Sequence, residues 1–168
     1  MIRPNEVTLL VLNEIDKCLS KHDYETIELS EVSNYIFIKA KKTYDGHLFE
    51  VDIKYDDVTR IVHISVYCLT SVPKDKRMLC LKLINFIAPF EKEAKYLLCP
   101  NSHIVSCLTF HNILNRRCSI GQLIESQASC SIENLSLTYD TIKNDDVKIC
   151  GIHPVRFYND FWKGTDYL

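Results

Sequence analysis

The pattern that decides the fold lies in residues 35–69, which read YIFIKAKKTYDGHLFEVDIKYDDVTRIVHISVYCL. Its middle part alternates the apolar side chains Phe49, Val51, Ile53 and Tyr55 with the charged side chains Glu50, Asp52 and Lys54. This period of two is typical of a β-strand with one buried face. Asp45-Gly46 is a strong signal for a two-residue hairpin turn, and Asp56-Asp57 indicates a second turn. We therefore predict three antiparallel strands at 35–41, 47–55 and 60–69.

Helical spacing of apolar residues predicts three helices outside this stretch. The first covers about Pro4 to Lys21. The second starts at Ser71-Val72-Pro73, with Ser71 as the N-cap, and Pro89 ends it. The third starts at Ser119, and its apolar residues recur every three or four positions as far as Leu135.

A second hairpin is predicted between the second and third helices, because residues 95–99 and 103–110 flank Pro100-Asn101. Residues 24–29 are a further candidate strand. The strands are joined by tight turns and do not alternate with helices, which favours an antiparallel sheet. The sequence thus predicts an α+β fold with the order α-β-β-β-α-β-β-α, in which helices pack on a sheet of about five strands.

The amino-acid composition of the chain changes near residue 140. We predict a single α+β domain over residues 1–138 and a C-terminal extension over residues 139–168. The extension carries four aromatic residues that we predict to bind protein: Phe157, Tyr158, Phe161 and Trp162. Their spacing matches one face of a helix, so they are expected to pack on their own domain, on a second copy or on a partner.

Composition excludes several classes of function. The 168 residues have a net charge of −2, so we expect no nucleic-acid partner. The four glycines are isolated, which excludes a phosphate-binding loop, and no other cofactor motif occurs. Residues 96–115 lack charged side chains, but Pro100-Asn101 predicts a turn within them, so we expect no membrane span.

The eight cysteines form no CxxC pair. We interpret them as free, mostly buried thiols of a protein in a reducing cytoplasm. Cys99, His103, Cys107 and His111 have the residue types of metal ligands at a spacing of four. On one strand, however, residues 103 and 107 would lie about 13 Å apart, too far to share a zinc ion, so we predict no metal site.

Residues 61–137 carry a resemblance to a known family. The strand IVHISV (61–66) leads through SVPK (71–74) into a helix with LCLKLIN (79–85), and a hairpin and a final helix follow. This order resembles the class I type III secretion chaperone fold and the YbjN-like domains of bacterial regulators. The resemblance implies a non-enzymatic, cytoplasmic bacterial protein that binds other proteins, often as a dimer, and it brings no catalytic residues.

Two hypotheses for function follow. The first is a non-enzymatic protein-binding module of chaperone-like or regulatory type, whose partner is unknown. The second helix is apolar nearly all round, so we expect either the C-terminal extension or a second chain, in a homodimer, to cover its outer face. The alternative is a small-molecule receptor or enzyme. Its pocket would lie between the sheet and the helices and would be lined by His63, Tyr67, His103 and His111.

Overall fold

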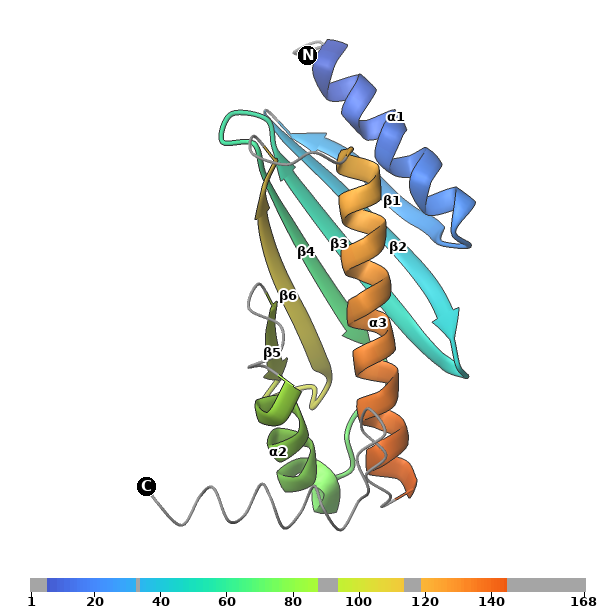
Figure 1. Ribbon diagram of the computed structural model, residues 1–168, viewed down its shortest axis with the longest axis vertical. Coiled ribbons are helices and arrows are strands. Elements are labelled where there is room, and N and C mark those ends of the chain that lie inside the picture. Colours follow the sequence, from blue (N-terminus) through green and yellow to red (C-terminus); the bar gives the residue numbers. More distant parts are fainter. Residues whose placement is uncertain (1–5, 33, 88–93, 114–118, 145–168) are drawn as a thin grey trace.

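Helices cover one face of an antiparallel sheet in the computed structural model, which describes residues 6–32, 34–87, 94–113 and 119–144 (Figure 1). The helices are α1 (Glu6–Lys21), α2 (Arg77–Ile87) and α3 (Ile120–Asn144), and a short 3-10 turn, η1 (Lys74–Lys76), precedes α2. The strands are β1 (Glu25–Val32), β2 (Tyr35–Tyr44), β3 (His47–Asp56), β4 (Ile61–Cys68), β5 (Ala94–Leu98) and β6 (Val105–Asn112). The predicted α+β class is confirmed.

The six strands lie in the order β1-β2-β3-β4-β6-β5, and every neighbouring pair is antiparallel. Asp45 and Gly46 form the predicted turn between β2 and β3, with φ angles of 52° and 79°. Two consecutive positive φ angles are the geometry of a type I′ turn, which matches the twist of the strands it joins. β4 lies between β3 and β6 and is therefore an interior strand of the sheet.

The sheet has one strand more than the predicted five, because the candidate segment after α1 forms β1. The chain order is therefore α-β-β-β-β-α-β-β-α over the described residues. β1 is an edge strand, and none of its eight residues is fully buried. A strand of this kind needs little apolar alternation, which explains its weak sequence signal.

The predicted start of the second helix at Ser71 is wrong. The backbone N–H of Val72 donates a hydrogen bond of 2.8 Å to the carbonyl oxygen of His103, and Val72 is buried. This contact holds the segment extended, so helical geometry begins only at η1, and Pro73 takes the N-cap position without a side-chain cap. Pro89, the predicted end of α2, lies outside the described residues.

Ser119 begins α3 as predicted. Its hydroxyl accepts the N–H of Gln122 at 3.2 Å, while the Gln122 side chain accepts the N–H of Ser119 at 3.3 Å. This reciprocal pair is a capping box. The helix continues to Asn144, so the domain boundary predicted between residues 138 and 139 falls inside α3, where Tyr139 and Ile142 are buried.

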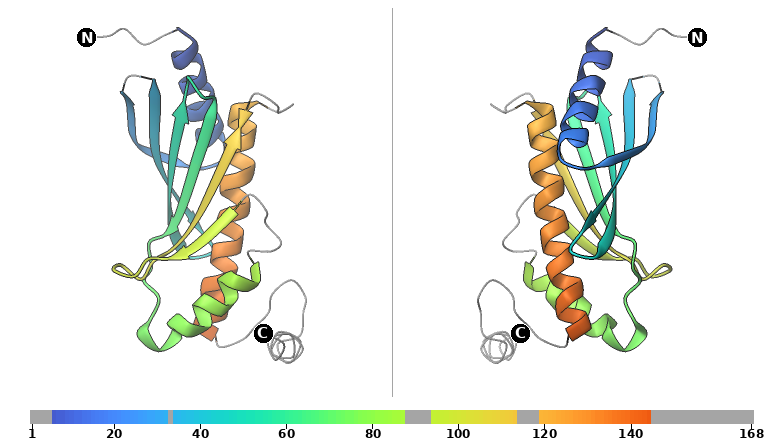
Figure 2. Two further views of the ribbon diagram at one scale, coloured as in Figure 1. Left: turned by 90° about the vertical axis from the view of Figure 1, so that its left-hand side faces the viewer. Right: turned by 90° about the vertical axis from the view of Figure 1, so that its right-hand side faces the viewer.

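The core lies between the sheet and the helices α1 and α3. Each long strand sends every second side chain into it, as the burial pattern of β3 and β4 shows. Side views place α1 and α3 on this face, and α2 lies at one end of the sheet (Figure 2). We call the opposite face of the sheet, over which none of the described helices lies, the open face.

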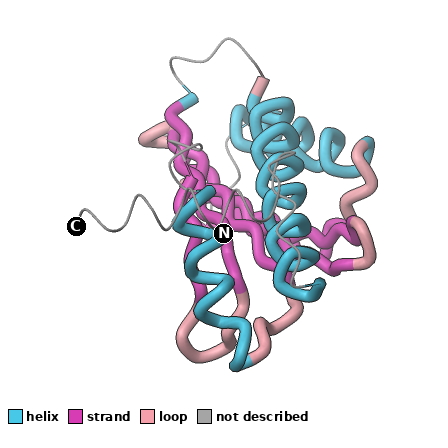
Figure 3. The backbone as a smooth tube through the Cα atoms, turned by 60° about the horizontal axis from the view of Figure 1, so that its bottom comes forward, coloured by secondary structure: helices cyan, strands magenta, loops and turns pink. Residues whose placement is uncertain are grey.

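Long helices and strands are connected mainly by short loops (Figure 3). No helix among the described residues is both long and apolar enough to cross a membrane. The six cysteines of the described part have free thiols; Cys68, Cys80 and Cys107 are buried, whereas Cys18, Cys99 and Cys130 are partly or largely exposed.

Candidate functional site

The open face carries a row of side chains that crosses five strands. Paired residues of neighbouring strands lie side by side, and the register aligns Ser30, Phe37, Lys54, His63 and Phe110 in this order. All five belong to the set that alternates away from the core. We call these five residues the aromatic row.

Lys54 stands in the middle of the aromatic row among rings. Its ammonium nitrogen lies 4.3 Å from the ring centre of Tyr35 and 5.6 Å from that of Phe37. The rings of His63 and Phe110 meet edge to face, with their centres 4.7 Å apart. Cation–π and edge-to-face contacts of this kind hold the side chains in place while they remain at the surface.

A second, ionic row runs beside the first and contains Glu28, Lys39, Asp52, Ser65 and Leu108. The Lys39 ammonium lies 3.3 Å from a Glu50 oxygen and 3.8 Å from Asp52 Oδ1. Hydrogen bonding to Glu50 and the charge of Asp52 raise the pKa of Lys39. Partial burial raises the pKa of Asp52 despite the opposing charge of Lys39.

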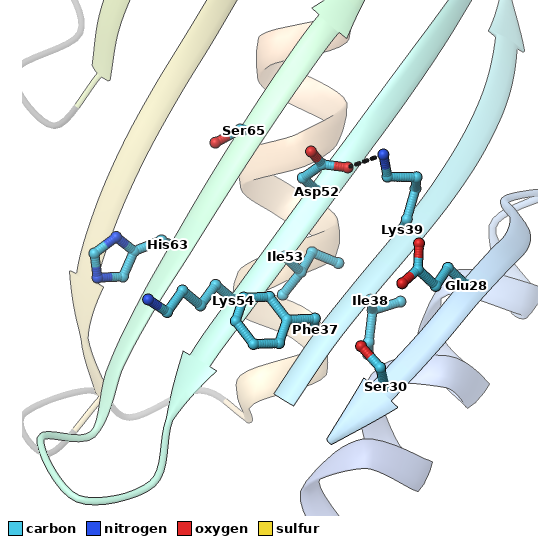
Figure 4. Close-up of a pocket in the computed structure, with 10 residues that line it drawn as sticks. All are labelled: Glu28, Ser30, Phe37, Ile38, Lys39, Asp52, Ile53, Lys54, His63 and Ser65. Atoms are coloured by element: carbon cyan, nitrogen blue, oxygen red, sulfur yellow. Dashed lines mark ion pairs between the residues drawn. The ribbon is translucent and has the colours of Figure 1, made fainter. Parts of the chain in front are cut away.

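A hollow of about 350 Å³ lies between the two rows (Figure 4). Its walls come from β1, β2, β3 and β4, and Lys54 lies between the Phe37 ring and His63 in the view of Figure 4. Partial burial and the neighbouring charge of Lys54 lower the pKa of His63. His63 is therefore neutral at pH 7, and Lys54 supplies the positive charge at this side of the hollow.

Apolar side chains on the open face remain exposed around these rows. Phe37 is 37% exposed and Phe110 is 49% exposed. Val32, Leu48 and Leu97 on the same face are also exposed. Single exposed apolar residues are ordinary, but several on one sheet face are typical of an interaction surface.

A smaller hollow of about 240 Å³ adjoins the ionic row, and Cys99 lines it with Tyr67 and Ser102. Hydrogen bonds from the Ser102 hydroxyl and from nearby backbone N–H groups lower the pKa of the Cys99 thiol. The loop that makes these bonds closes through His103, whose φ is 57° and whose N–H donates to the Cys99 carbonyl at 2.9 Å.

The set of residues predicted to line a pocket between the sheet and the helices is wrong. His63 and Tyr67 point to the open face, whereas His111 is buried on the face covered by helices. The register explains the separation, because His111 pairs with Val62 and not with His63. His103 lies in the loop between β5 and β6, so the four predicted residues do not line one pocket.

Three side chains of the site were not singled out from the sequence: Phe37, Lys54 and Phe110. The alternation of β3 did place Lys54 opposite the core, and the same reasoning applied to β2 would have found Phe37. The predicted protein-binding residues Phe157, Tyr158, Phe161 and Trp162 lie outside the described residues. In the described part, no three His, Cys, Asp or Glu side chains are grouped closely enough to hold a metal ion.

In comparisons with known proteins, this chain matches no protein-family model, no curated protein and no solved structure. The resemblance to the type III secretion chaperone fold and to YbjN-like domains therefore stays a prediction.

Proposed function

We propose that this protein is a non-enzymatic protein-binding module of chaperone-like or regulatory type, and that the open face of its sheet is the binding surface. The observation that carries the proposal is the exposure of Phe37 and Phe110 on a sheet face over which no described helix packs. Aromatic residues are enriched in protein interfaces and often carry much of their binding free energy.

The electrostatics of the open face suit a protein partner better than a polyanion. Glu28, Glu50 and Asp52 balance the lysines of the same face, and Lys39 is already paired with two carboxylates. A nucleic acid would need an excess of unpaired cations. The six free thiols of the described residues agree with a reducing cytoplasm as the place of action, which is part of this proposal.

Affinity capture with surface variants tests the proposal. The 168-residue protein would be tagged and expressed in its native cells, beside a Phe37→Ser/Phe110→Ser double variant. Val58→Ser is a matched control, because Val58 is an equally apolar residue that is 70% exposed in the turn after β3. We expect a partner that the wild type and the control retain and the double variant loses. A set of bound proteins that is identical for all three would contradict the proposal.

The hollow itself favours a second candidate function, the binding of a small molecule. Its volume of about 350 Å³ lies in the range of small-ligand sites, and Lys54, His63 and Asp52 offer polar contacts. A thermal-shift screen of common metabolites tests this candidate. A ligand that stabilises the wild type and not Lys54→Met would support it, and the absence of any such ligand would count against it.

A further inference from the structure

We propose that the aromatic row is the docking site for residues 157–162 of the same chain, with the carboxylate of Asp160 paired to Lys54. This inference rests on the proposed function, because it takes the same open face as a binding surface and names one occupant. A partner would then have to displace the C-terminal segment before it could bind.

The first argument is that Lys54 contacts rings and has no carboxylate partner among the described residues. No described carboxylate lies within ion-pair distance of its ammonium, in contrast to Lys39. Two acidic residues, Asp52 and Asp56, lie two positions from Lys54 on the same face of β3. Asp52 lies 3.8 Å from the Lys39 ammonium, and the Asp56 carboxylate accepts the N–H groups of Val58 and Thr59 at 3.0 and 3.3 Å. A cation held among exposed rings fits a segment that presents a carboxylate next to aromatic side chains.

The second argument is that the chain contains such a segment. Residues 157–162 read FYNDFW, so that Asp160 is followed directly by two aromatic residues and Asn159 separates it from the two that precede it. The cations Arg156 and Lys163 border the segment, and the ionic row beside the docking site carries the carboxylates of Glu28 and Asp52. The aromatic row and the segment are therefore complementary in both apolar character and charge.

The third argument is reach. Twelve residues, 145–156, connect the end of α3 to the segment and can span about 40 Å when extended. Tyr139 in the last part of α3 is hydrogen-bonded to Thr70, just beyond the end of β4. From Thr70 the aromatic row at His63 is seven residues away along β4, or about 23 Å, the last five residues of α3 add about 8 Å, and a sheet layer adds about 10 Å. The path is therefore about 40 Å long, and the connection spans it when almost fully extended.

The single tryptophan of the chain, Trp162, lies in the segment and reports directly on docking. In the 168-residue protein we expect blue-shifted Trp162 emission and acrylamide quenching at least threefold weaker than in a synthetic peptide of residues 152–168. Lys54→Glu and Phe110→Ser should shift the emission to that of the peptide. Lys95→Glu is the matched control, because Lys95 is an exposed lysine that pairs with Leu108 in the neighbouring row.

A double variant that exchanges the two charges provides a second test. Lys54→Asp combined with Asp160→Lys should restore the protected emission that either single variant loses. Circular dichroism would confirm that every variant remains folded, which we expect because Lys54 is on the surface.

Three results would overturn the inference. Trp162 emission in the wild type that equals that of the peptide would mean that the segment does not dock. If the Trp162 emission stays protected in both Lys54→Glu and Phe110→Ser, the segment docks at a different place on the protein. Protection that depends on protein concentration, with a dimeric mass in light scattering, would assign the segment to a second copy. In the first case a partner lost by the Phe37→Ser/Phe110→Ser variant would still support the proposed function.

Discussion

The surroundings of Cys99 shift its thiol pKa in the opposite direction to the shifts at Cys18, Cys68 and Cys80. Burial raises the pKa of those three thiols, whereas hydrogen bonds from Ser102 and its loop lower the pKa of Cys99. Because the thiolate is the reactive form, the lower pKa increases the reactive fraction of Cys99 at a given pH.

We therefore expect Cys99 to be alkylated by iodoacetamide faster than Cys18 at pH 7.5. Ser102→Ala removes one hydrogen bond to the thiolate, so it should raise the pKa of the Cys99 thiol and slow its alkylation below that pKa. The rate profile against pH, followed by peptide mass spectrometry, should have its midpoint at a higher pH in Ser102→Ala than in the wild type. Equal midpoints would show that the loop does not stabilise the thiolate.

Glycine is needed at position 46 because of the backbone conformation, and not because a side chain would lack space. Its φ is 79°, and a Cβ atom placed on it would meet no atom within 4 Å. Gly46→Ala should therefore destabilise the protein by about 1 kcal/mol through backbone strain alone. Gly46→Asn should lose less, because asparagine adopts positive φ more readily. Urea unfolding of both variants checks this, and equal losses would contradict the explanation.

At the scale of elements, the contact between α1 and α3 depends on Gly121. A Cβ atom on this residue would lie 3.0 Å from Cys18 Cβ and 3.2 Å from the carbonyl oxygen of Glu14. The Gly121 N–H also donates to the Glu14 carboxylate at 2.9 Å. Glycine thus lets the two helices approach closely at the first turn of α3.

Gly121→Val should force α1 and α3 apart and lower the free energy of unfolding by about 1–3 kcal/mol, the range for overpacked contacts. Ser126→Val is the matched comparison, since it puts the same residue on α3 at an exposed position. Urea denaturation measures both. A Gly121→Val variant as stable as the wild type would mean that the helices can separate without loss.

Tyr139 joins the last part of α3 to two other segments. Its hydroxyl donates to the carbonyl oxygen of Thr70 at 2.6 Å and accepts the N–H of Val105 at 3.2 Å. Burial raises the pKa of this hydroxyl, which therefore stays protonated near neutral pH.

Tyr139→Phe leaves the Thr70 carbonyl and the buried Val105 N–H without this partner. We expect it to destabilise the fold by about 1–3 kcal/mol. Tyr44→Phe, at an exposed tyrosine at the end of β2, is the control and should change stability little. Thermal unfolding of both variants gives the comparison, and a loss for Tyr139→Phe no larger than for Tyr44→Phe would refute the role of the hydroxyl.

For the whole molecule, the sequence contains eight cysteines and the six that the structure describes are free thiols. Thiol titration of protein purified without reductant, in denaturant, should therefore return eight thiols per chain. A count of six or fewer, unchanged when the sample is prepared under nitrogen, would indicate native disulfides and contradict the proposed reducing compartment.

The sequence by itself determined the secondary structure where one periodicity dominated. The alternation of Phe49 and Val51 placed β3, Asp45-Gly46 placed its hairpin, and Ser119 placed the start of α3. In each case the signal is local, since a turn or a cap is formed by residues within three positions of each other. The α+β class followed, because tight turns join neighbouring strands.

The tertiary structure alone decided which side chains of different strands come together in one site. His63 and His111 lie on the neighbouring strands β4 and β6. Strand register nevertheless puts His63 on the open face and His111 in the core. Register depends on pairing between distant segments, and a shift of one residue reverses every side chain. The same pairing aligned Phe37, Lys54 and Phe110 across the sheet, a row that no local pattern in the chain could assemble.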